Sequence, residues 1–402
     1  MKSFIEISLI SLLFQGGYAK QVQTNSTAPI KSSYVQGSYI VTLKPSTEDN
    51  ALEAHLDKIR RLFGSNKHTG VKNKINHVYG TVLLGYSAEF TNDVLAKVNA
   101  MPEVEDIGED QLVEAADIQT KATWGLARLS SKDALGKSKS LSYNYDPKAG
   151  EGVDVYVIDS GIKIDHPDFQ GRAKWGANFA DDVNKDSTGH GTHVAGIIGS
   201  KTYGVAKRST LFAVKVIDHN GIGSQNAFIA GIEWVVQNKK EGRGCVINLS
   251  MGVKKNKALN TAVHNAVKSG CVVVVAAGNT NVNACDISPA SEPSAITVGA
   301  STLDDKRAYF SNWGRCLDVY APGENIVSLS NKGGDSSKSG TSMSAGYVSG
   351  LVANIMSKTG KYNPDDVLKE LEKNYIRTKL AYDFKFSPRL LVSNIGLADS
   401  WC

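Results

Sequence analysis

The chain has 402 residues, a formal net charge of +5 at neutral pH, and 41% hydrophobic against 21% charged residues. This length exceeds one ordinary domain, and the composition is typical of a globular protein with a sizeable core. Lysine and arginine are spread along the chain rather than gathered in blocks, so neither composition nor charge indicates a nucleic-acid partner.

The first residues show the pattern of a secretory signal peptide. Lys2 precedes an apolar run from Phe4 to Phe14, and Gly17 and Ala19 are small residues placed for a cut after Ala19. The run is too short to span a membrane, and no later segment holds about 18 uninterrupted apolar residues. We therefore expect residues 1–19 to be removed and the mature protein to be exported and free of the membrane.

After a polar linker from residue 20 to about 36, a first body of sequence shows short strand and helix patterns. It extends to a polar stretch at Glu114–Lys121. The order strand, helix, strand, strand, helix, strand predicts a small α+β unit with an antiparallel sheet. The segments that carry these patterns are Tyr39–Leu43, Ala51–Phe63, Val78–Phe90 (both middle strands), Val94–Val98 and Val104–Val113.

Beyond Trp124, nearly continuous apolar runs alternate with helical patterns. Such runs are typical of parallel strands that are buried on both faces. The sequence therefore predicts a doubly wound α/β domain with a central parallel sheet, whose sites form at the carboxyl ends of the strands. The predicted strands are Val153–Ile158, Thr210–Val216, Val246–Ser250 and Val272–Ala277, and the predicted helices are His193–Gly199, Gln225–Gln237 and Lys257–Ser269.

Two motifs place an acid and a base at such junctions. Asp159 directly follows a buried run, where a carboxylate can orient a histidine and stabilise its charged form. His190 lies between glycines at a helix start, where an imidazole can take a proton and return it. Taken singly, Asp159 fits a turn residue, and His190 with His193 fits a metal site, although no third ligand stands nearby.

Two further residues complete the set. Ser342 opens an apolar helical run, where the positive end of the helix dipole and free N–H groups can bind a developing oxyanion. Asn279 ends the apolar run that begins at Val272, and its amide can donate to the same oxyanion. Each alone fits a helix cap or a turn. Together, each at a strand end or helix start, the four form a specific signal for one site.

The four residues, in the chain order Asp, His, Asn, Ser, resemble the subtilase family in its proteinase K branch. The resemblance covers Thr123 to about Leu391, and includes Trp124–Arg128, Asn220–Ser224 and Ser288–Ser294. It implies a secreted subtilisin-like serine endopeptidase that needs no cofactor for its chemistry and is a monomer. Its implied catalytic triad is Asp159, His190 and Ser342, with Asn279 in the oxyanion hole.

The first body, from about residue 38 to 115, resembles the inhibitory propeptide of that family. The resemblance implies an autoprocessed zymogen with a propeptide over 20–116, a cut near Ala116 and a peptidase domain over 117–402. The propeptide would act as an intramolecular inhibitor and folding aid. Secreted fungal subtilases digest extracellular protein with broad specificity, and keratin-like material is among the substrates that the resemblance implies.

Substrate-binding residues follow from the same resemblance. Two extended segments would hold a peptide between them as an added β-strand. Small residues on one wall of the primary specificity pocket would admit an aromatic or large aliphatic side chain. The first segment is Gly221, Ile222 and Gly223, the second is Leu249, Ser250, Met251 and Gly252, and the pocket wall is Ala276, Ala277 and Gly278.

A structural calcium ion is also implied by the resemblance. The matching ligands are the carbonyls of Pro293 and Ala295 and the carboxylate of Asp318. Asp318 equally fits a solvated surface acid.

The chain departs from the family after Ser342, where Gly346 replaces a proline and Tyr347 replaces a histidine. These changes remove no catalytic group, but a glycine there loosens the first turn of the helix.

The cysteines and the glycosylation motifs leave several questions open. Two intramolecular disulfides are possible in an oxidising compartment, but the family pattern does not transfer because Val194 and Ile296 stand at its cysteine positions. Sequons occur at Asn25, in the linker, and at Asn248, where a predicted buried strand argues against a glycan. The cysteines are Cys245, Cys271, Cys285, Cys316 and Cys402.

Two other functions remain as alternatives. The altered segment after Ser342 is compatible with a catalytically silent relative that only binds peptides. A metallohydrolase using His190 and His193 would lose activity with a chelator, whereas a serine enzyme would react with a sulfonyl fluoride or an organophosphonate.

Overall fold

The computed structural model describes residues 34–45, 50–63, 73–81, 83–111, 117–136, 141–377, 380, 387–388 and 390–394. Four predictions lie outside these residues: the signal peptide, the Asn25 sequon, the cut near Ala116 and Cys402. No helix among the described residues is long and apolar enough to cross a membrane.

The first body is a four-stranded antiparallel sheet with strand order β2-β3-β1-β4. Two helices pack on it, because their apolar residues recur at helical spacing and cover one core that includes Leu56, Ile59 and Val98. The element order confirms the predicted α+β unit. The bounds are β1 Tyr34–Leu43, α1 Ala51–Phe63, β2 Lys74–Tyr79, β3 Gly85–Glu89, α2 Asn92–Asn99 and β4 Val104–Gln111.

The second body is built on a nine-stranded sheet with the order β18-β19-β15-β14-β12-β10-β7-β9-β8. From β19 to β8 the paired strands are parallel, and β18 alone is antiparallel to its neighbour. The bounds are β7 Val153–Asp159, β8 Ala173–Asn178, β9 Thr210–Lys215, β10 Gly244–Leu249, β12 Val272–Ala276, β14 Ile296–Ser301, β15 Val319–Pro322, β18 Tyr375–Arg377 and β19 Leu390–Val392.

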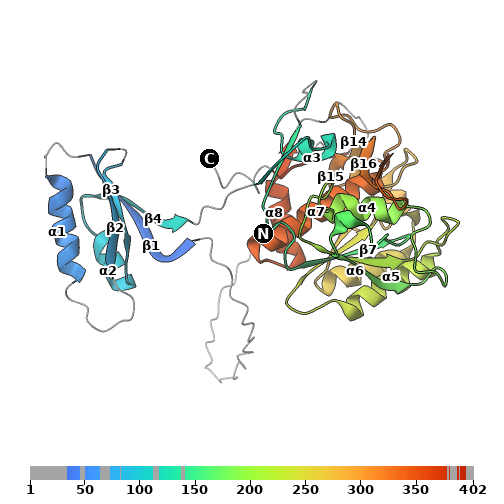
Figure 1. The fold of residues 1–402 in the computed structure, drawn as a ribbon, viewed down its shortest axis with the longest axis horizontal. Coiled ribbons are helices and arrows are strands. Elements are labelled where there is room, and N and C mark those ends of the chain that lie inside the picture. The colour runs from blue at the N-terminus through green and yellow to red at the C-terminus, as the bar shows by residue number, and fades with distance from the viewer. Residues whose placement is uncertain are drawn as a thin grey trace, which may run out of the picture. The chain divides into compact units, whose positions relative to one another are not determined.

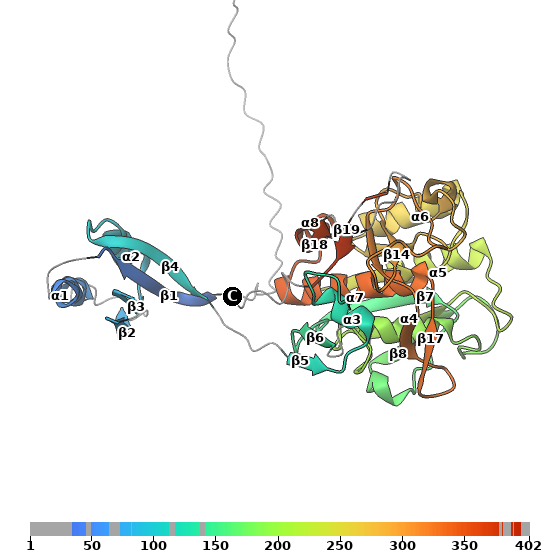
Figure 2. The same cartoon turned by 90° about the horizontal axis from the view of Figure 1, so that it is seen from above.

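Helices cover both faces of this sheet, which confirms the doubly wound prediction. One core lies between the sheet and α4, α7 and α8, and another lies between the sheet and α5 and α6. In Figure 1 α4 and α7 lie above β7 while α5 and α6 lie below it, and Figure 2 looks from above. The helices are α3 Trp124–Leu129, α4 His190–Gly199, α5 Gln225–Asn238, α6 Lys257–Lys268, α7 Thr341–Thr359 and α8 Pro364–Lys373.

The direction of winding reverses at β7. The chain passes from β7 to β8 and β9 on one side, then returns to β10 and continues through β12 and β14 on the other. In an open parallel sheet such a switch point leaves a crevice at the carboxyl ends of the strands. Asp159 is the last residue of β7 and therefore lies at this crevice.

Smaller strand pairs and two disulfides complete the body. Cys245–Cys271 joins β10 to the residue just before β12, and Cys285–Cys316 joins the segments that follow β12 and β14. This is the pairing that the sequence left open. The remaining strands are β5 Asp117–Thr120 with β6 Ser142–Tyr145, β11 Val253–Lys254 with β13 Ile287–Ser288, and β16 Ile326–Leu329 with β17 Asp335–Lys338.

Candidate active site

The first two predicted residues meet directly. Asp159 is fully buried, and His190 is the first residue of α4. His190 Nδ1 lies 2.8 Å from Asp159 Oδ1 and 2.9 Å from Oδ2. The Ser160 N–H also donates to Asp159 Oδ1 at 2.7 Å. A carboxylate in this position fixes the proton of the imidazole on Nδ1 and leaves Nε2 free to accept one.

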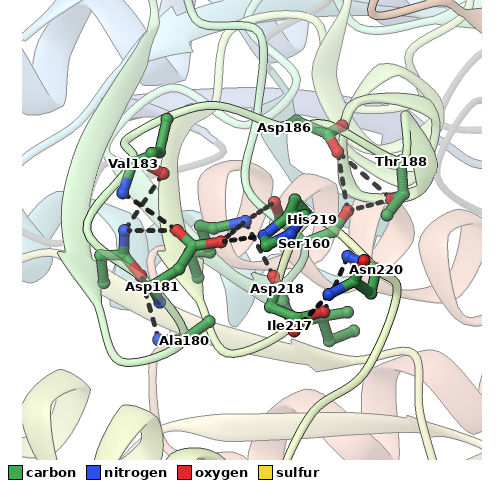
Figure 3. A network of polar contacts seen from close by, with 12 residues as sticks. Ser160, Ala180, Asp181, Val183, Asp186, Thr188, Ile217, Asp218, His219 and Asn220 are labelled. Carbon is green, nitrogen blue, oxygen red and sulfur yellow. Dashed lines mark hydrogen bonds and ion pairs between the residues drawn. The ribbon is translucent and has the colours of Figure 1, made fainter.

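The helix start that carries His190 is held by Asp186. This carboxylate is buried and accepts from the N–H groups of Gly189 (2.8 Å) and Thr192 (2.9 Å). These are backbone donors at a helix start that lack an intrahelical partner, and the N-cap Gly189 has no side chain to serve them. Figure 3 shows Asp186 with Thr188 and Ser160, whose hydroxyls complete the network.

The pKa values of the two histidines of α4 are shifted in opposite directions. Burial works against the charged form of His190, but the carboxylate of Asp159 outweighs it and raises the pKa of His190 above its ordinary value. Burial lowers the pKa of His193 to about 4, so His193 is neutral. Its Nε2 lies 3.1 Å from the carbonyls of both Ile326 and Ser336, which ties α4 to the β16–β17 hairpin. His193 is thereby used in packing rather than presented as a metal ligand.

Ser342 is the second residue of α7, on the helix that packs against α4. Its position gives it the positive end of the dipole of a 19-residue helix and a backbone N–H in the first turn. The Ser342 hydroxyl donates to the carbonyl of Ser250 at 2.9 Å in this structure. The hydroxyl is therefore anchored to the end of β10 rather than to His190.

Asn279 lies three residues beyond β12 and is exposed. Its Oδ1 accepts from both the N–H and the hydroxyl of Thr341, each at 2.8 Å. With Oδ1 occupied, Nδ2 is the amide atom left to donate. The Thr341 contacts place that donor beside Ser342, the next residue along the chain.

The first predicted substrate segment is a turn at the edge of the crevice. Ile217 and Gly223 form an antiparallel bridge, and Ile222 is 68% exposed. Asp218 closes the turn by accepting from the N–H groups of Asn220 and Ile222, both at 2.9 Å. The Ile222 bond is the main reason that the pKa of Asp218 is lowered. The segment is thus held in shape with an apolar side chain facing water.

A buried lysine supports the base of this turn. Lys215, the last residue of β9, is fully buried, and its Nζ donates to the carbonyls of Ile217 (2.8 Å) and Ser160 (3.3 Å). Its ion-pair partner is Asp181 at 3.4 Å, which Figure 3 shows near Asp218 and His219. The lysine therefore joins the residue after Asp159 to Ile217, which pairs with Gly223 of the substrate segment.

The second predicted segment begins where β10 ends. Leu249 and Ser250 are buried, Met251 is half-buried and Gly252 is exposed. The predicted pocket wall follows β12, with Ala276 and Ala277 buried and Gly278 half-buried in a left-handed conformation (φ +102°). Both segments lie at the carboxyl ends of neighbouring parallel strands, as the sequence predicted.

The departures after Ser342 have a packing explanation. Tyr347 is fully buried, and a side chain at Gly125 would collide with its hydroxyl end. An added Cβ at Gly346 would lie 3.2 Å from Ile197 Cγ2, so Gly346 lets α7 approach α4 closely. Both residues therefore fit the core around them.

The remaining predicted sites lie elsewhere on the body. Asn248 is fully buried in β10, where its Nδ2 donates to Ser250 Oγ (2.7 Å) and its Oδ1 accepts from Ser349 Oγ (3.0 Å). This placement argues against a glycan on Asn248.

The predicted calcium ligands lie in the segments before β14 and β15. Pro293 is exposed and Ala295 is buried before β14. Asp318 precedes β15 and accepts the Thr297 N–H at 2.7 Å.

Several residues around the site were missed by sequence reasoning. Thr341 stood inside the motif around Ser342, and Asp186 stands just before the helix start at His190, where acidic residues commonly cap helices. Those two carried a usable local signal. Nothing in the sequence around Lys215 indicated its role, because a lysine at the end of a strand is usually exposed to solvent. Its burial follows only from the tertiary fold.

Comparison with known proteins identifies a family for each of the two bodies. The model of the subtilase family matches residues 150–387, and the model of the peptidase inhibitor I9 family matches residues 38–116. "Alkaline protease 2" of Aspergillus fumigatus is 38% identical over 94% of this chain and 85% of its own. "Subtilisin-like serine protease Pen c 2" of Penicillium citrinum is 40% identical over 89% of this chain and 86% of its own.

Solved structures give the same result. The crystal structure of a cold-adapted subtilisin-like serine proteinase superposes with a TM-score of 0.63 at 38% identity. The match covers 68% of this chain and 98% of that protein. The chain belongs to the subtilase family of serine endopeptidases, and it carries an I9-type propeptide domain ahead of its peptidase domain.

Proposed function

We propose that Asp159, His190 and Ser342 are the catalytic triad of a secreted endopeptidase that matures by cutting its own chain. The observation that carries this proposal is the Asp159–His190 pair, 2.8 Å apart at the switch point of the sheet. Ser342 at the start of α7 supplies the nucleophile beside it, and the Asn279 amide supplies an oxyanion donor. The arrangement performs acyl transfer.

In the reaction, Ser342 exchanges its bond to the Ser250 carbonyl for one to His190 Nε2. Such bonds are often formed only when substrate is present. His190 takes the serine proton as the oxygen attacks the scissile carbonyl, and Asp159 stabilises the imidazolium. Asn279 Nδ2 and the Ser342 N–H bind the oxyanion, and His190 then gives the proton to the leaving amine.

Substrate recognition is expected to rest mostly on the peptide backbone. A peptide between residues 221–223 and 249–252 would form ladder hydrogen bonds with both, which gives affinity for many sequences. The wall of Ala276, Ala277 and Gly278 leaves room for a large apolar side chain. We infer broad specificity for extracellular proteins, with keratin-like material among them.

Maturation is part of the proposal. The I9-type body would inhibit the peptidase until cleavage near Ala116, which leaves 20–116 as the propeptide and 117–402 as the enzyme. Export fits the two disulfides, which persist in oxidising compartments. We infer that the enzyme acts as a monomer, and Asn25 stays a predicted glycan acceptor in the pro-region.

We further propose a structural calcium ion at Asp318 with the carbonyls of Pro293 and Ala295. Burial raises the pKa of Asp318 to about 6, and no ion pair to it is present among the described residues. A half-buried carboxylate without a counter-charge fits an oxygen-ligated cation. Bound calcium would hold the loop before β14 to the one before β15, and it would take no part in the chemistry.

Chelation is expected to destabilise the inhibitor-blocked enzyme, and added calcium to restore it. Calcium at one hundred times its Kd would contribute about 2.7 kcal/mol to the free energy of unfolding. Scanning calorimetry with and without chelator measures this. Asp318→Asn should abolish the response, whereas Glu151→Gln, on an exposed side chain, should keep it. An unchanged melting temperature on chelation would refute the calcium site.

Covalent labelling tests the proposed function against a silent peptide-binding relative. A serine-directed organophosphonate should add one adduct per mature chain, located on Ser342 by peptide mass. The labelling rate requires neutral His190, whose pKa is raised, so it should rise with pH and reach half its maximum above pH 6.5. Lys338 lowers that pKa, so Lys338→Gln should move the midpoint to higher pH. Absence of an adduct would favour the silent relative.

A further inference from the structure

The side chain of Asn312 forms hydrogen bonds to residues on both sides of Asn279, the proposed oxyanion donor. Asn312 is fully buried in the loop between β14 and β15. Its Nδ2 donates to the Ala277 carbonyl at 2.7 Å, and its Oδ1 accepts from the N–H groups of Thr280 (3.1 Å) and Val282 (3.0 Å). The Thr280 hydroxyl adds a further bond to Oδ1 at 3.3 Å.

The backbone of the same residue reaches the same loop. The Asn312 N–H donates to the Gly278 carbonyl at 2.9 Å. Gly278 has a φ of +102°, and a Cβ added there would collide with Asn312 Nδ2. The amide of Asn312 therefore occupies the volume that a side chain at position 278 would need. Asn279 lies between residues that Asn312 holds on both sides.

Asn312 is itself fixed from behind. The Ser311 hydroxyl accepts the Ala300 N–H at 3.0 Å and donates to the Asn312 carbonyl at 2.9 Å. The Ala308 N–H donates to the Ala300 carbonyl at 2.8 Å. Ala300 belongs to β14, so these bonds anchor the Asn312 loop to the central sheet. The sheet therefore holds Asn312, and Asn312 holds the loop of Asn279.

The Asn279 side chain has its own anchor at Thr341, but only its Oδ1 is tied there. Where Nδ2 points then depends on the backbone at residues 278–280. We propose that Asn312 is a positioning residue that sets the oxyanion donor through this backbone. The inference rests on the proposed function. It predicts a loss in kcat that depends on Asn279. Asn312 also bonds the backbone of Ala277 and Gly278 in the predicted pocket wall, so the double-mutant cycle, rather than an unchanged KM, separates positioning of the oxyanion donor from an effect on the pocket.

A double-mutant cycle tests this. Asn312→Ala, Asn279→Ala and the double variant are expressed as full chains, and active enzyme is counted with a serine-directed titrant. Asn279→Ala should lower kcat by about 10²–10³-fold. Asn312→Ala should lower kcat by about 10–100-fold, since misplacing a catalytic group is that costly. A change in KM that arises through the pocket wall should be the same in the Asn279→Ala background. In the Asn279→Ala background the same change should lower kcat less than about threefold.

Two variants control for folding. Asn374→Ala removes another buried amide, which donates to the Glu370 carbonyl, and should change stability without this loss in kcat. Asn312→Asp keeps the size and the acceptor for Thr280 and Val282 but loses the donor to Ala277. It should show the same pattern if the alanine variant fails to fold.

Three outcomes would overturn the inference. Equal losses in kcat from Asn312→Ala in both backgrounds would show that Asn312 acts independently of Asn279. An unchanged kcat in Asn312→Ala would show no positioning role at all. An unchanged kcat in Asn279→Ala would refute the oxyanion donor of the proposed function, and the inference with it.

Discussion

Ser342→Ala is expected to give a chain that keeps its propeptide and shows almost no peptidase activity. The variant removes the attacking oxygen while His190, Asp159 and the oxyanion donors stay in place, and loss of a nucleophile in such a triad costs more than about 10⁵-fold in kcat. Because the proposed maturation uses the same site, the cut near Ala116 should fail as well. Intact mass of the secreted protein, read beside wild type, reports both effects.

The matched control is Ser344→Ala. Ser344 is buried two residues further along α7 and donates to the carbonyls of Ala321 (3.0 Å) and Pro322 (3.1 Å). Its loss should affect stability and leave a matured, active enzyme. If Ser342→Ala matured at the wild-type rate in a host without other secreted proteases, self-processing would be wrong.

Arg128→Met is expected to lower the free energy of unfolding by about 3–5 kcal/mol. Arg128 and Asp305 are almost fully buried, and the guanidinium donates to Oδ1 at 2.7 Å and to Oδ2 at 3.0 Å. A third bond reaches the Ser131 carbonyl at 2.6 Å. The variant leaves the Asp305 carboxylate buried without its partner. Urea unfolding of inhibitor-blocked enzyme measures the loss without self-digestion.

Restoring neutrality should recover much of that stability. The double variant Arg128→Met with Asp305→Asn removes both charges, and Asn tolerates the left-handed backbone of residue 305 (φ +54°). Lys361→Met, which breaks an ion pair of 3.0 Å with partly exposed Glu370, should cost less than about 1 kcal/mol. If the Arg128→Met variant were as stable as the Lys361→Met variant, burial would not be what makes the Arg128–Asp305 ion pair important for stability.

In the second body, the four strands that the sequence predicted are nearly continuous apolar runs, whereas the equally buried β14 and β15 were missed. A run such as Val272–Ala276 has only apolar residues because helices cover it above and below. Strand β8, Ala173–Asn178, lies at the sheet edge and mixes lysine, glycine and asparagine, so its pattern is indistinct. The order of strands could not be derived either, since apolar runs do not specify their neighbours.

The residues of the candidate site likewise include some that the sequence predicted and some that it could not predict. Asp159, His190, Ser342 and Asn279 sit in local motifs at strand ends and helix starts, where the chemistry requires particular residue types. Asn312 has no such motif, because an asparagine in a loop is common and its partners are brought together only by the fold. The Ser342–Ser250 bond was also beyond the sequence, because it depends on the side-chain rotamer.

The reversal of winding at β7 has a consequence for how the protein is made. A ribosome delivers Asp159 and His190 well before Ser342, which lies in the first turn of a helix packed against β7 and against β10, β12, β14 and β15 on one side of it. If the proposed triad is correct, a chain grown only as far as α4 holds the acid and the base but no nucleophile, and its sheet still lacks β14 and β15. Under the proposed function, the chain therefore cannot cleave a peptide bond before residue 342 has been synthesised.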